Sequence, residues 1–158
     1  MCIRDRGTSW SNVEKAIKSL KSAHALDLEI INEMPRDHLS KLIYSAGFHN
    51  VKSARLKYLT SYLLANFKGK IEALKRLPTS TARSQLLAID GIGPETADAI
   101  LLYALGKSVF MVDAYTKRLF TRLGYSVDQD SYDSWQTLLV SQMPVSYTHL
   151  TLPTNREV

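Results

Sequence analysis

The chain has 158 residues, of which 45% are hydrophobic and 22% charged, which is enough apolar content for one domain with a core. The formal net charge of +5 fits a nucleic-acid partner without requiring one. No apolar run is long enough to span a bilayer, and no apolar segment follows the charged N-terminus as a secretion signal would require.

The two ends of the sequence lack the signs of folded elements. MCIRDR (1–6) and VSYTHLTLPTNREV (145–158) show no helical period and resemble translated adapter sequence. We therefore expect the folded domain to comprise residues 7–144, as part of a longer parent protein. The one cysteine, Cys2, lies in the first of these segments, so the remainder offers neither a disulfide nor a cysteine metal site. An intracellular compartment is therefore expected.

Helical periodicity organises the first half of the chain. Residues 10–20 are predicted to form a helix whose inner face carries Val13, Ala16, Ile17 and Leu20. Further helices are predicted over 26–34, 36–46, 50–67 and 71–77, which end at proline or glycine. No stretch alternates as a strand would, so the predicted fold class is all-α, a compact array of about eight short helices.

Residues 86–106 predict two helices joined by a glycine hairpin. Residues 79–81 offer caps for the first helix. Gly91 and Gly93 suit a turn at positive φ, and Pro94 suits the first position of the second helix. Amides that open a helix have no partner within it and attract anions, so the hairpin is a candidate phosphate site. An ordinary tight turn between two helices is the alternative.

Asp113 stands between an apolar link (108–112) and a predicted helix that begins at Ala114. Aspartate in this position is a common N-cap, which gives it a purely structural explanation. A carboxylate held rigidly at a helix start also suits catalysis, and the two explanations are compatible. A last helix is predicted after Asp130 or Ser131, with apolar residues Trp135, Leu138 and Leu139.

The sequence LLAIDGIGPETADAI (86–100), followed by Val112, Asp113 and Arg118, resembles the helix-hairpin-helix (HhH-GPD) DNA glycosylase superfamily. That superfamily includes endonuclease III, the adenine glycosylase of mismatch repair and the bacterial alkyladenine glycosylases. The resemblance extends from about residue 8 to about residue 144. It implies a compact helical glycosylase fold and a base-excision-repair enzyme acting on double-stranded DNA that contains a damaged base. In such an enzyme the hairpin residues would contact the DNA backbone: Gly91, Ile92, Gly93 and Thr96.

The resemblance also implies roles for residues in the first half. Phe48 matches the apolar side chain that fills the gap left by a flipped base, with a core phenylalanine as the alternative. Lys52 follows it and is expected to contact phosphates, together with Arg55 and Lys57. Trp10 is assigned to the base pocket, where it would stack on the extruded base, or else to the core.

In the superfamily the residue matching Asp113 is the catalytic carboxylate. Breaking the bond between base and sugar builds positive charge on the sugar. A fixed carboxylate stabilises that charge and orients the attacking water. The base must first leave the stack, because its glycosidic bond is inaccessible inside duplex DNA.

Glu95 stands where endonuclease III-like enzymes carry a lysine that attacks the sugar and forms a Schiff base. A carboxylate forms no imine, and neither Lys107 nor Lys117 occupies the matching turn. We therefore expect a monofunctional glycosylase similar to the alkyladenine (3-methyladenine) branch. Glu95 itself also suits the first turn of a helix. The alternatives are a bifunctional glycosylase with AP-lyase activity and a non-catalytic helix-hairpin-helix DNA-binding module.

No cofactor is expected in the folded part of this chain. Many members of the superfamily hold an iron–sulfur cluster through four cysteines beyond the last helix, so a cluster remains an expectation for the parent protein only. His24, His38 and His49 show no metal-ligand spacing and are expected at the surface. The expected partner is damaged duplex DNA, with no membrane association, and the expected assembly is a monomer. The resemblance implies a cytoplasmic, nucleoid-associated protein of a prokaryote.

Overall fold

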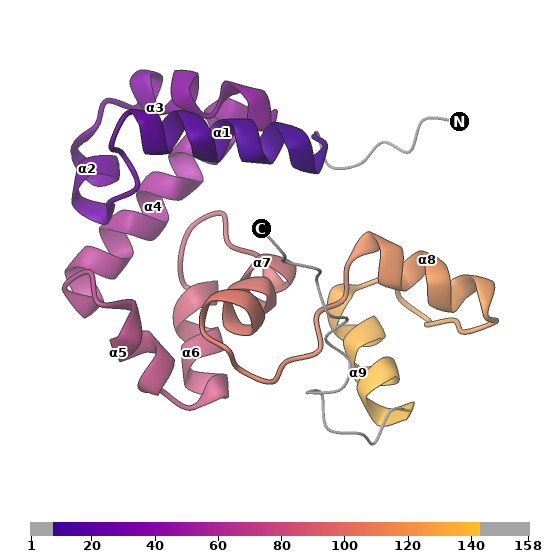
Figure 1. Ribbon diagram of the computed structural model, residues 1–158. Helices are drawn as coiled ribbons and strands as arrows, with labels where there is room; N and C mark the ends of the chain where they lie inside the picture. The colour runs from indigo at the N-terminus through magenta and orange to yellow at the C-terminus, as the bar shows by residue number, and fades with distance from the viewer. Residues whose placement is uncertain (1–7, 143–158) are drawn as a thin grey trace. The chain divides into compact units, whose positions relative to one another are not determined.

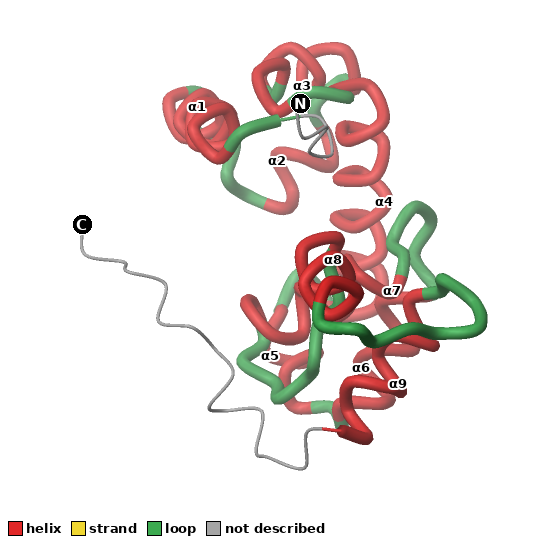
Figure 2. The backbone as a smooth tube through the Cα atoms, turned by 90° about the vertical axis from the view of Figure 1, so that its right-hand side faces the viewer, coloured by secondary structure: helices red, strands yellow, loops and turns green. Residues whose placement is uncertain are grey.

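The computed structural model describes residues 8–142, and within them it contains helices and no strand (Figure 2). The all-α prediction is therefore confirmed. Within that range there are nine α-helices, a 3₁₀-helix (η1) and a π-helix (η2). Their bounds are α1 Trp10–Ser22, α2 Leu28–Glu33, α3 Arg36–Leu42, η1 Tyr44–Ala46, α4 His49–Phe67, α5 Ile71–Arg76, α6 Thr79–Leu87, α7 Pro94–Ala99, η2 Ile100–Ala104, α8 Ala114–Arg122 and α9 Tyr132–Gln142 (Figure 1). The adapter-like ends, 1–6 and 145–158, lie outside the described residues.

The described residues fall into two compact units. The first unit comprises residues 8–73 together with 89–91, and the second comprises residues 74–88 together with 92–142. None of the helices in the part of the chain that the structure describes is long and apolar enough to cross a membrane.

The long helix α4 organises the first unit, where it packs against α2 and α3 (Figures 1 and 2). Its buried residues are Ser53, Thr60 and Leu63, whereas the apolar Val51 is 48% exposed. The Ser53 and Thr60 hydroxyls donate to carbonyls three residues earlier in the same helix, at 3.0 and 3.1 Å. Because their polar groups are satisfied within the helix, these hydroxyl residues can be buried without a partner from another helix.

The core of the first unit is aliphatic and gathers α1, α2, α3 and η1. In α1, Ala16 and Leu20 are buried as predicted, but Ile17 is 36% exposed. The Asp27 side chain caps α2 by accepting from the amides of the next helical turn, at 2.8 and 3.1 Å. The cluster is made of Ala16, Leu20, Ala25, Ile31, Leu39, Ile43 and Ala46.

The core of the second unit is built around the last helix. Val112, Trp135 and Leu139 are buried together, with aromatic residues of α8 and its flanking loops packed on them. Ser131 caps α9 by accepting from an amide at 3.0 Å, as predicted. The caps predicted at residues 79–81 are wrong: the chain enters α6 directly from Pro78, so these residues already belong to the helix.

Candidate nucleic-acid interface and catalytic site

The hairpin turn has the predicted course, but its two glycines differ. Gly91 has φ +80°, and a Cβ placed there would lie 2.6 Å from Cγ of Arg55. Gly93 has φ −90°, which any residue adopts, so the prediction of positive φ is wrong for Gly93. A Cβ at Gly93 would meet no atom within 4 Å, so the space above it is open. Ile92 is buried, and Pro94 is the first residue of α7, both as predicted.

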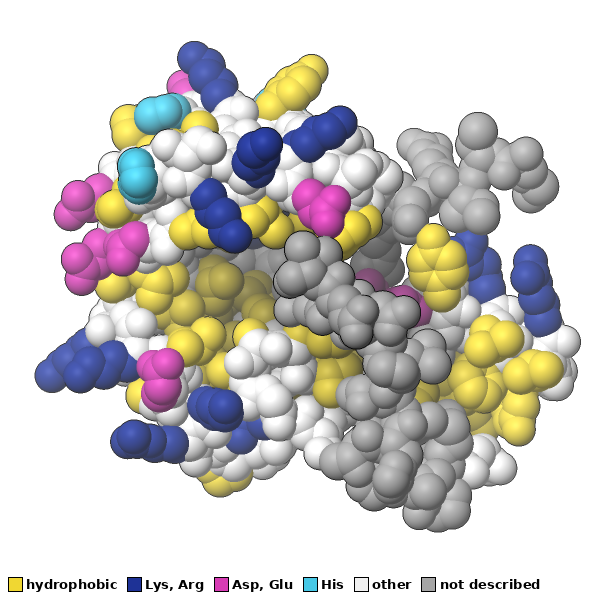
Figure 3. Space-filling model, in the orientation of Figure 1, with side chains coloured by type: hydrophobic (Ala, Val, Ile, Leu, Met, Phe, Trp, Pro, Cys, Tyr) yellow, Lys and Arg dark blue, Asp and Glu magenta, His cyan; other side chains and the backbone are white. Residues whose placement is uncertain are grey.

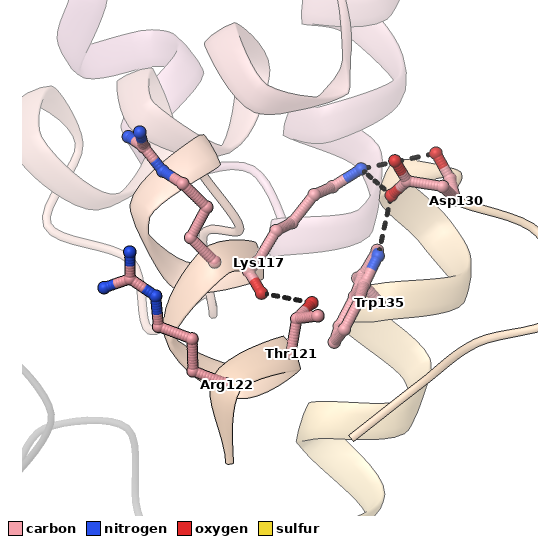
Figure 4. A pocket seen from close by; sticks show the side chains of 6 residues that line it. Lys117, Thr121, Arg122, Asp130 and Trp135 are labelled. Carbon is pink, nitrogen blue, oxygen red and sulfur yellow. Dashed lines mark hydrogen bonds and ion pairs between the residues drawn. The ribbon is translucent and has the colours of Figure 1, made fainter. Parts of the chain in front are cut away.

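The first turn of α7 carries Glu95, half-buried, and Thr96, exposed. Two lysines of the second unit have structural partners instead of lying at this turn. Lys107 Nζ donates to a backbone carbonyl just before α6 at 2.6 Å. Lys117 Nζ is paired with the Asp130 carboxylate at 2.8 Å (Figure 4). Each ammonium group therefore already has a bonding partner within the second unit.

Asp113 is the N-cap of α8, as predicted. Its Oδ1 accepts two hydrogen bonds from Thr116, at 2.7 Å from the backbone amide and at 2.9 Å from the hydroxyl. The side chain is half-buried, and within residues 8–142 its Oδ2 accepts no hydrogen bond. One oxygen is thus fixed by the helix start, while the other keeps its lone pairs for a substrate or a water molecule.

A cation lies one helical turn from Asp113. The Arg118 guanidinium sits over the Tyr115 ring, 4.5 Å from its centroid, and Arg118 Nε donates to the carbonyl of Ala114 at 3.1 Å. Tyr115 is 52% exposed. Stacking restricts the rotamers of the guanidinium and leaves further N–H groups for an anion.

Residues of α8, of α9 and of the loop between them line an open hollow of about 330 Å³ (Figure 4). Asp130 accepts at 2.8 Å from both Lys117 Nζ and Trp135 Nε1, and the bond from Lys117 holds the pKa of Asp130 below its ordinary value. Since Lys117 is offset by Asp130, the two arginines dominate the charge of the hollow. It is lined by Lys117, Arg118, Thr121, Arg122, Asp130 and Trp135.

Phe48 lies between η1 and α4 with its side chain 66% exposed, so the alternative of a core phenylalanine is wrong. Its backbone is left-handed, at φ +46° and ψ +33°. A bulky residue rarely adopts this conformation, which persists only where the surrounding structure imposes it.

Bonds on both sides hold the Phe48 turn. Before it, Lys52 Nζ donates to the carbonyl of Ala46. After it, the buried Ser40 hydroxyl bonds to Asn50 Oδ1 and to His49 Nδ1, each at 2.7 Å. Because the amide oxygen only accepts, Ser40 donates to Asn50 and accepts from His49. His49 is therefore part of a half-buried network, and the prediction that it is a surface residue is wrong.

The three basic residues of α4 predicted to contact phosphates have different surroundings. Lys52 is bonded to the η1 carbonyl described above, and Lys57 Nζ donates to the carbonyl of Asn32 at 2.7 Å. Arg55 is exposed, and its side chain lies against Gly91 of the hairpin. Arg55 is thus the member of this group that lies beside Gly91, within the first unit.

Trp10 is the first residue of α1 and is 64% exposed, with its Nε1 donating to Glu14 at 2.9 Å. The alternative of a core aromatic is wrong, and its contact with an extruded base stays a prediction. The sequence reasoning missed Asp98 of α7, which is fully buried and paired with Arg83 of α6 at 2.8 Å. An aspartate between two alanines in an apolar helix was the available signal.

The part of the chain that the structure describes lacks a cluster of metal ligands. Among these residues no group of three His, Cys, Asp or Glu side chains is placed to hold a metal ion. Residues 8–142 contain no cysteine, so they supply no thiolate for an iron–sulfur cluster.

The chain is similar to DNA glycosylases along most of its length. It is 42% identical over 144 residues to a candidate DNA repair glycosylase, MJ1434, of Methanocaldococcus jannaschii, which covers 90% of this chain and 65% of that protein. It is 30% identical over 118 residues to endonuclease III of Thermotoga maritima, covering 75% of this chain and 51% of that enzyme. The chain therefore spans less than two thirds of the length of these relatives.

Solved glycosylase structures share the fold. The 3-methyladenine DNA glycosylase (MagIII) of H. pylori, bound to 1,N6-ethenoadenine, superposes with a TM-score of 0.75 and 30% identity over 85% of this chain and 64% of that one. A trapped endonuclease III–DNA covalent intermediate, at 23% identity and a TM-score of 0.73, shares the fold over 87% of this chain and 60% of that one. The family model of the HhH-GPD superfamily of base excision DNA repair proteins matches residues 2–144, and the chain belongs to this superfamily.

Proposed function

We propose that this chain carries the glycosylase part of an enzyme that flips a damaged base out of duplex DNA and hydrolyses its N-glycosidic bond with water. The observation that carries the proposal is the Asp113 carboxylate, fixed through Oδ1 at the start of α8. Membership of a base excision repair superfamily supports damaged DNA as the substrate.

Asp113 acts in this proposal by electrostatics and by orientation. As the base leaves, positive charge develops on the deoxyribose, and a preorganised carboxylate stabilises it without having to reorganise. Oδ2 also accepts a hydrogen bond from the attacking water, and this bond orients the water toward the sugar. Because Thr116 holds Oδ1 from two directions, the orientation of Oδ2 is set before the substrate binds.

DNA binding is assigned to the hairpin and to the Phe48 turn. The opening amides of α7 and the exposed Thr96 receive a phosphate, for which the space above Gly93 is open, and Arg55 adds a cation beside Gly91. The exposed ring of Phe48 fills the gap in the duplex when a base leaves, which offsets part of the lost stacking.

The proposed chemistry is monofunctional. Glu95 occupies the first turn of α7 and forms no imine, and the ammonium groups of Lys107 and Lys117 hold structural bonds. Similarity to a 3-methyladenine DNA glycosylase points to an alkylated purine as the released base. The alternative is a bifunctional enzyme of the endonuclease III type, which the similarity to endonuclease III of T. maritima favours.

The test is release of free 3-methyladenine from methylated duplex DNA by Asp113→Asn. Asparagine keeps the N-cap but lacks the charge, so we expect the single-turnover rate constant to fall by roughly 10²-fold or more. Asp128→Asn, an exposed aspartate of the same unit, is the matched control and should retain the wild-type rate. Undiminished release by Asp113→Asn would exclude the proposed role.

Borohydride trapping separates the two mechanisms. A monofunctional enzyme forms no Schiff base, so reduction with borohydride should yield no covalent protein–DNA adduct. An adduct would establish the bifunctional alternative, and mass spectrometry of the trapped peptide would identify the lysine.

A further inference from the structure

Asp98 is a buried carboxylate that the proposed reaction does not use. It lies on α7 and is fully buried. Its Oδ1 accepts from Arg83 Nε at 2.8 Å, and its Oδ2 accepts from Tyr132 at 2.7 Å, from Gln136 at 2.9 Å and from Arg83 Nη2 at 3.3 Å. Burying a carboxylate is costly unless a counter-charge and hydrogen bonds compensate it, and here both are present.

Two of these partners lead from Asp98 to the backbone that precedes Asp113. The Tyr132 oxygen accepts from the amide of Val112 at 3.3 Å, and Gln136 Nε2 donates to the carbonyl of Phe110 at 2.6 Å. The directions are consistent. Tyr132 gives its only proton to Asp98 and has lone pairs left for the amide, and the Gln136 amide has one N–H for each acceptor.

Val112, whose amide is bonded to Tyr132, is tightly packed in the core. Val112 is 1% exposed and belongs to the core cluster with Trp135 and Leu139 of α9. Asp113 follows it directly and begins α8. The place of its carboxylate is therefore set on one side by Thr116 and on the other by the backbone of residues 110–112.

We propose that Asp98 is a positioning residue for Asp113: through Tyr132 and Gln136 it fixes the backbone of residues 110–112 and thereby the catalytic carboxylate. The inference rests on the proposed catalytic role of Asp113. All its members lie in the second unit, on α6, α7, α9 and the segment before α8.

The charges of the network keep its hydrogen-bond directions constant. Burial, and then the bond to Asp98, raise the pKa of Tyr132, so its hydroxyl stays protonated and donates at every physiological pH. The bond to Asp98 likewise raises the pKa of Arg83. An amide at position 98 would lack one of the two acceptor oxygens and would remove the buried counter-charge of Arg83, which would keep only the exposed Asp133 at 3.7 Å.

Tyr132→Phe is the decisive variant, because it removes the relay to Val112 and keeps the pairing of Asp98 with Arg83. Displacing a catalytic group by an ångström costs up to about 10²-fold, so we expect the single-turnover rate of 3-methyladenine release to fall about tenfold or more, with the Kd for the duplex within about twofold of wild type. Losing one hydrogen bond should also speed exchange of the Val112 amide by about tenfold, measured by NMR.

Control variants separate this effect from a general loss of stability. Tyr125→Phe removes a hydroxyl from a partly exposed tyrosine of the same unit. It should change neither the rate of base release nor the exchange of the Val112 amide. Gln136→Met removes the bonds to Phe110 and to Asp98 and keeps the volume, so it should lower the rate of base release while Tyr132 still protects the Val112 amide. Asp98→Asn should lower the rate of base release, speed exchange of the Val112 amide and lower the melting temperature.

The outcomes separate this inference from the proposed function. Unchanged Val112 exchange in Tyr132→Phe overturns the positioning role, because the relay then does not hold the segment. Faster exchange with a wild-type rate overturns it as well, provided that Asp113→Asn is inactive in the same assay. Base release retained by Asp113→Asn overturns the proposed function, while the Val112 exchange still reports whether the Asp98 network orders the backbone.

Discussion

Phe48 shows at the level of one residue how a side chain can be placed at a cost to folding. A left-handed backbone costs a residue other than glycine about 1–2 kcal/mol, and an exposed ring returns little of this through burial. The bonds of Ser40 and Lys52 on either side of the turn maintain it. Folding alone thus gives no reason for an aromatic residue here, whereas a wedge in duplex DNA does.

Phe48→Gly and Phe48→Ala form a matched pair of variants. Both remove the ring, so both should weaken binding to a duplex with an abasic site, where the gap is already open. Glycine adopts a positive φ freely and alanine does not, so in urea unfolding the glycine variant should be the more stable by about 1 kcal/mol. Equal stabilities would show that the turn relaxes once the ring is removed, and unchanged binding would remove Phe48 from the interface.

At the level of elements, the two glycines of the hairpin are required for different reasons. Gly91 is needed for its conformation, because the turn requires φ +80° and the stem of Arg55 fills the space above it. Gly93 has an ordinary backbone and open space, so its lack of a side chain is not explained by the fold. Close approach of a DNA strand to the opening amides of α7 would explain it.

Gly91→Ala and Gly93→Ala should therefore fail in different ways. Alanine at Gly91 should lower the free energy of unfolding by roughly 1–2 kcal/mol, because the left-handed backbone is strained by a Cβ. Alanine at Gly93 should leave stability within about 0.5 kcal/mol of wild type and still weaken binding to undamaged duplex. A Gly93→Ala protein with wild-type affinity would contradict a close approach of the strand.

For the molecule as a whole, the net charge of +5 overstates the cations available to DNA. Lysine and arginine side chains are spread over the face seen in Figure 3 and do not form one patch. Several lysine ammonium groups are bound inside the fold, those of Lys52, Lys57 and Lys107 to backbone carbonyls and that of Lys117 to Asp130. Salt dependence of binding measures the cations that remain.

Arg55→Gln tests whether Arg55 is one of the cations that neutralise DNA phosphates. Each phosphate neutralised contributes about −0.9 to the slope of log K against log salt for duplex DNA, so losing Arg55 should reduce the slope by about one. Lys57→Gln is the comparison: it should keep the slope and lower the melting temperature, because Lys57 bonds to the carbonyl of Asn32. The reverse pattern would place Lys57, and not Arg55, against the DNA.

Local rules account for what the sequence predicted correctly. Periodic apolar residues predicted the helices, and Pro94 predicted the start of α7. The position of Asp113 between an apolar link and a helix predicted that it is an N-cap. These features depend on residues a few positions apart, so they can be predicted from the sequence alone. The family motif added the proposed chemistry of the hairpin and of Asp113.

The sequence by itself thus determined the helical class, the glycine hairpin and the residue proposed for catalysis. Only the tertiary structure decided that Lys52 and Lys57 hold backbone carbonyls, that Ser40 and His49 brace the Phe48 turn, and that Asp98 reaches the backbone before Asp113. The reason is the range of the interactions. Caps form within one helical turn. The bonds of Lys52 and Ser40 join one helix to the next, Lys57 and Asn32 are 25 residues apart, and Asp98 and Tyr132 are 34 residues apart, so these partners meet only when helices pack.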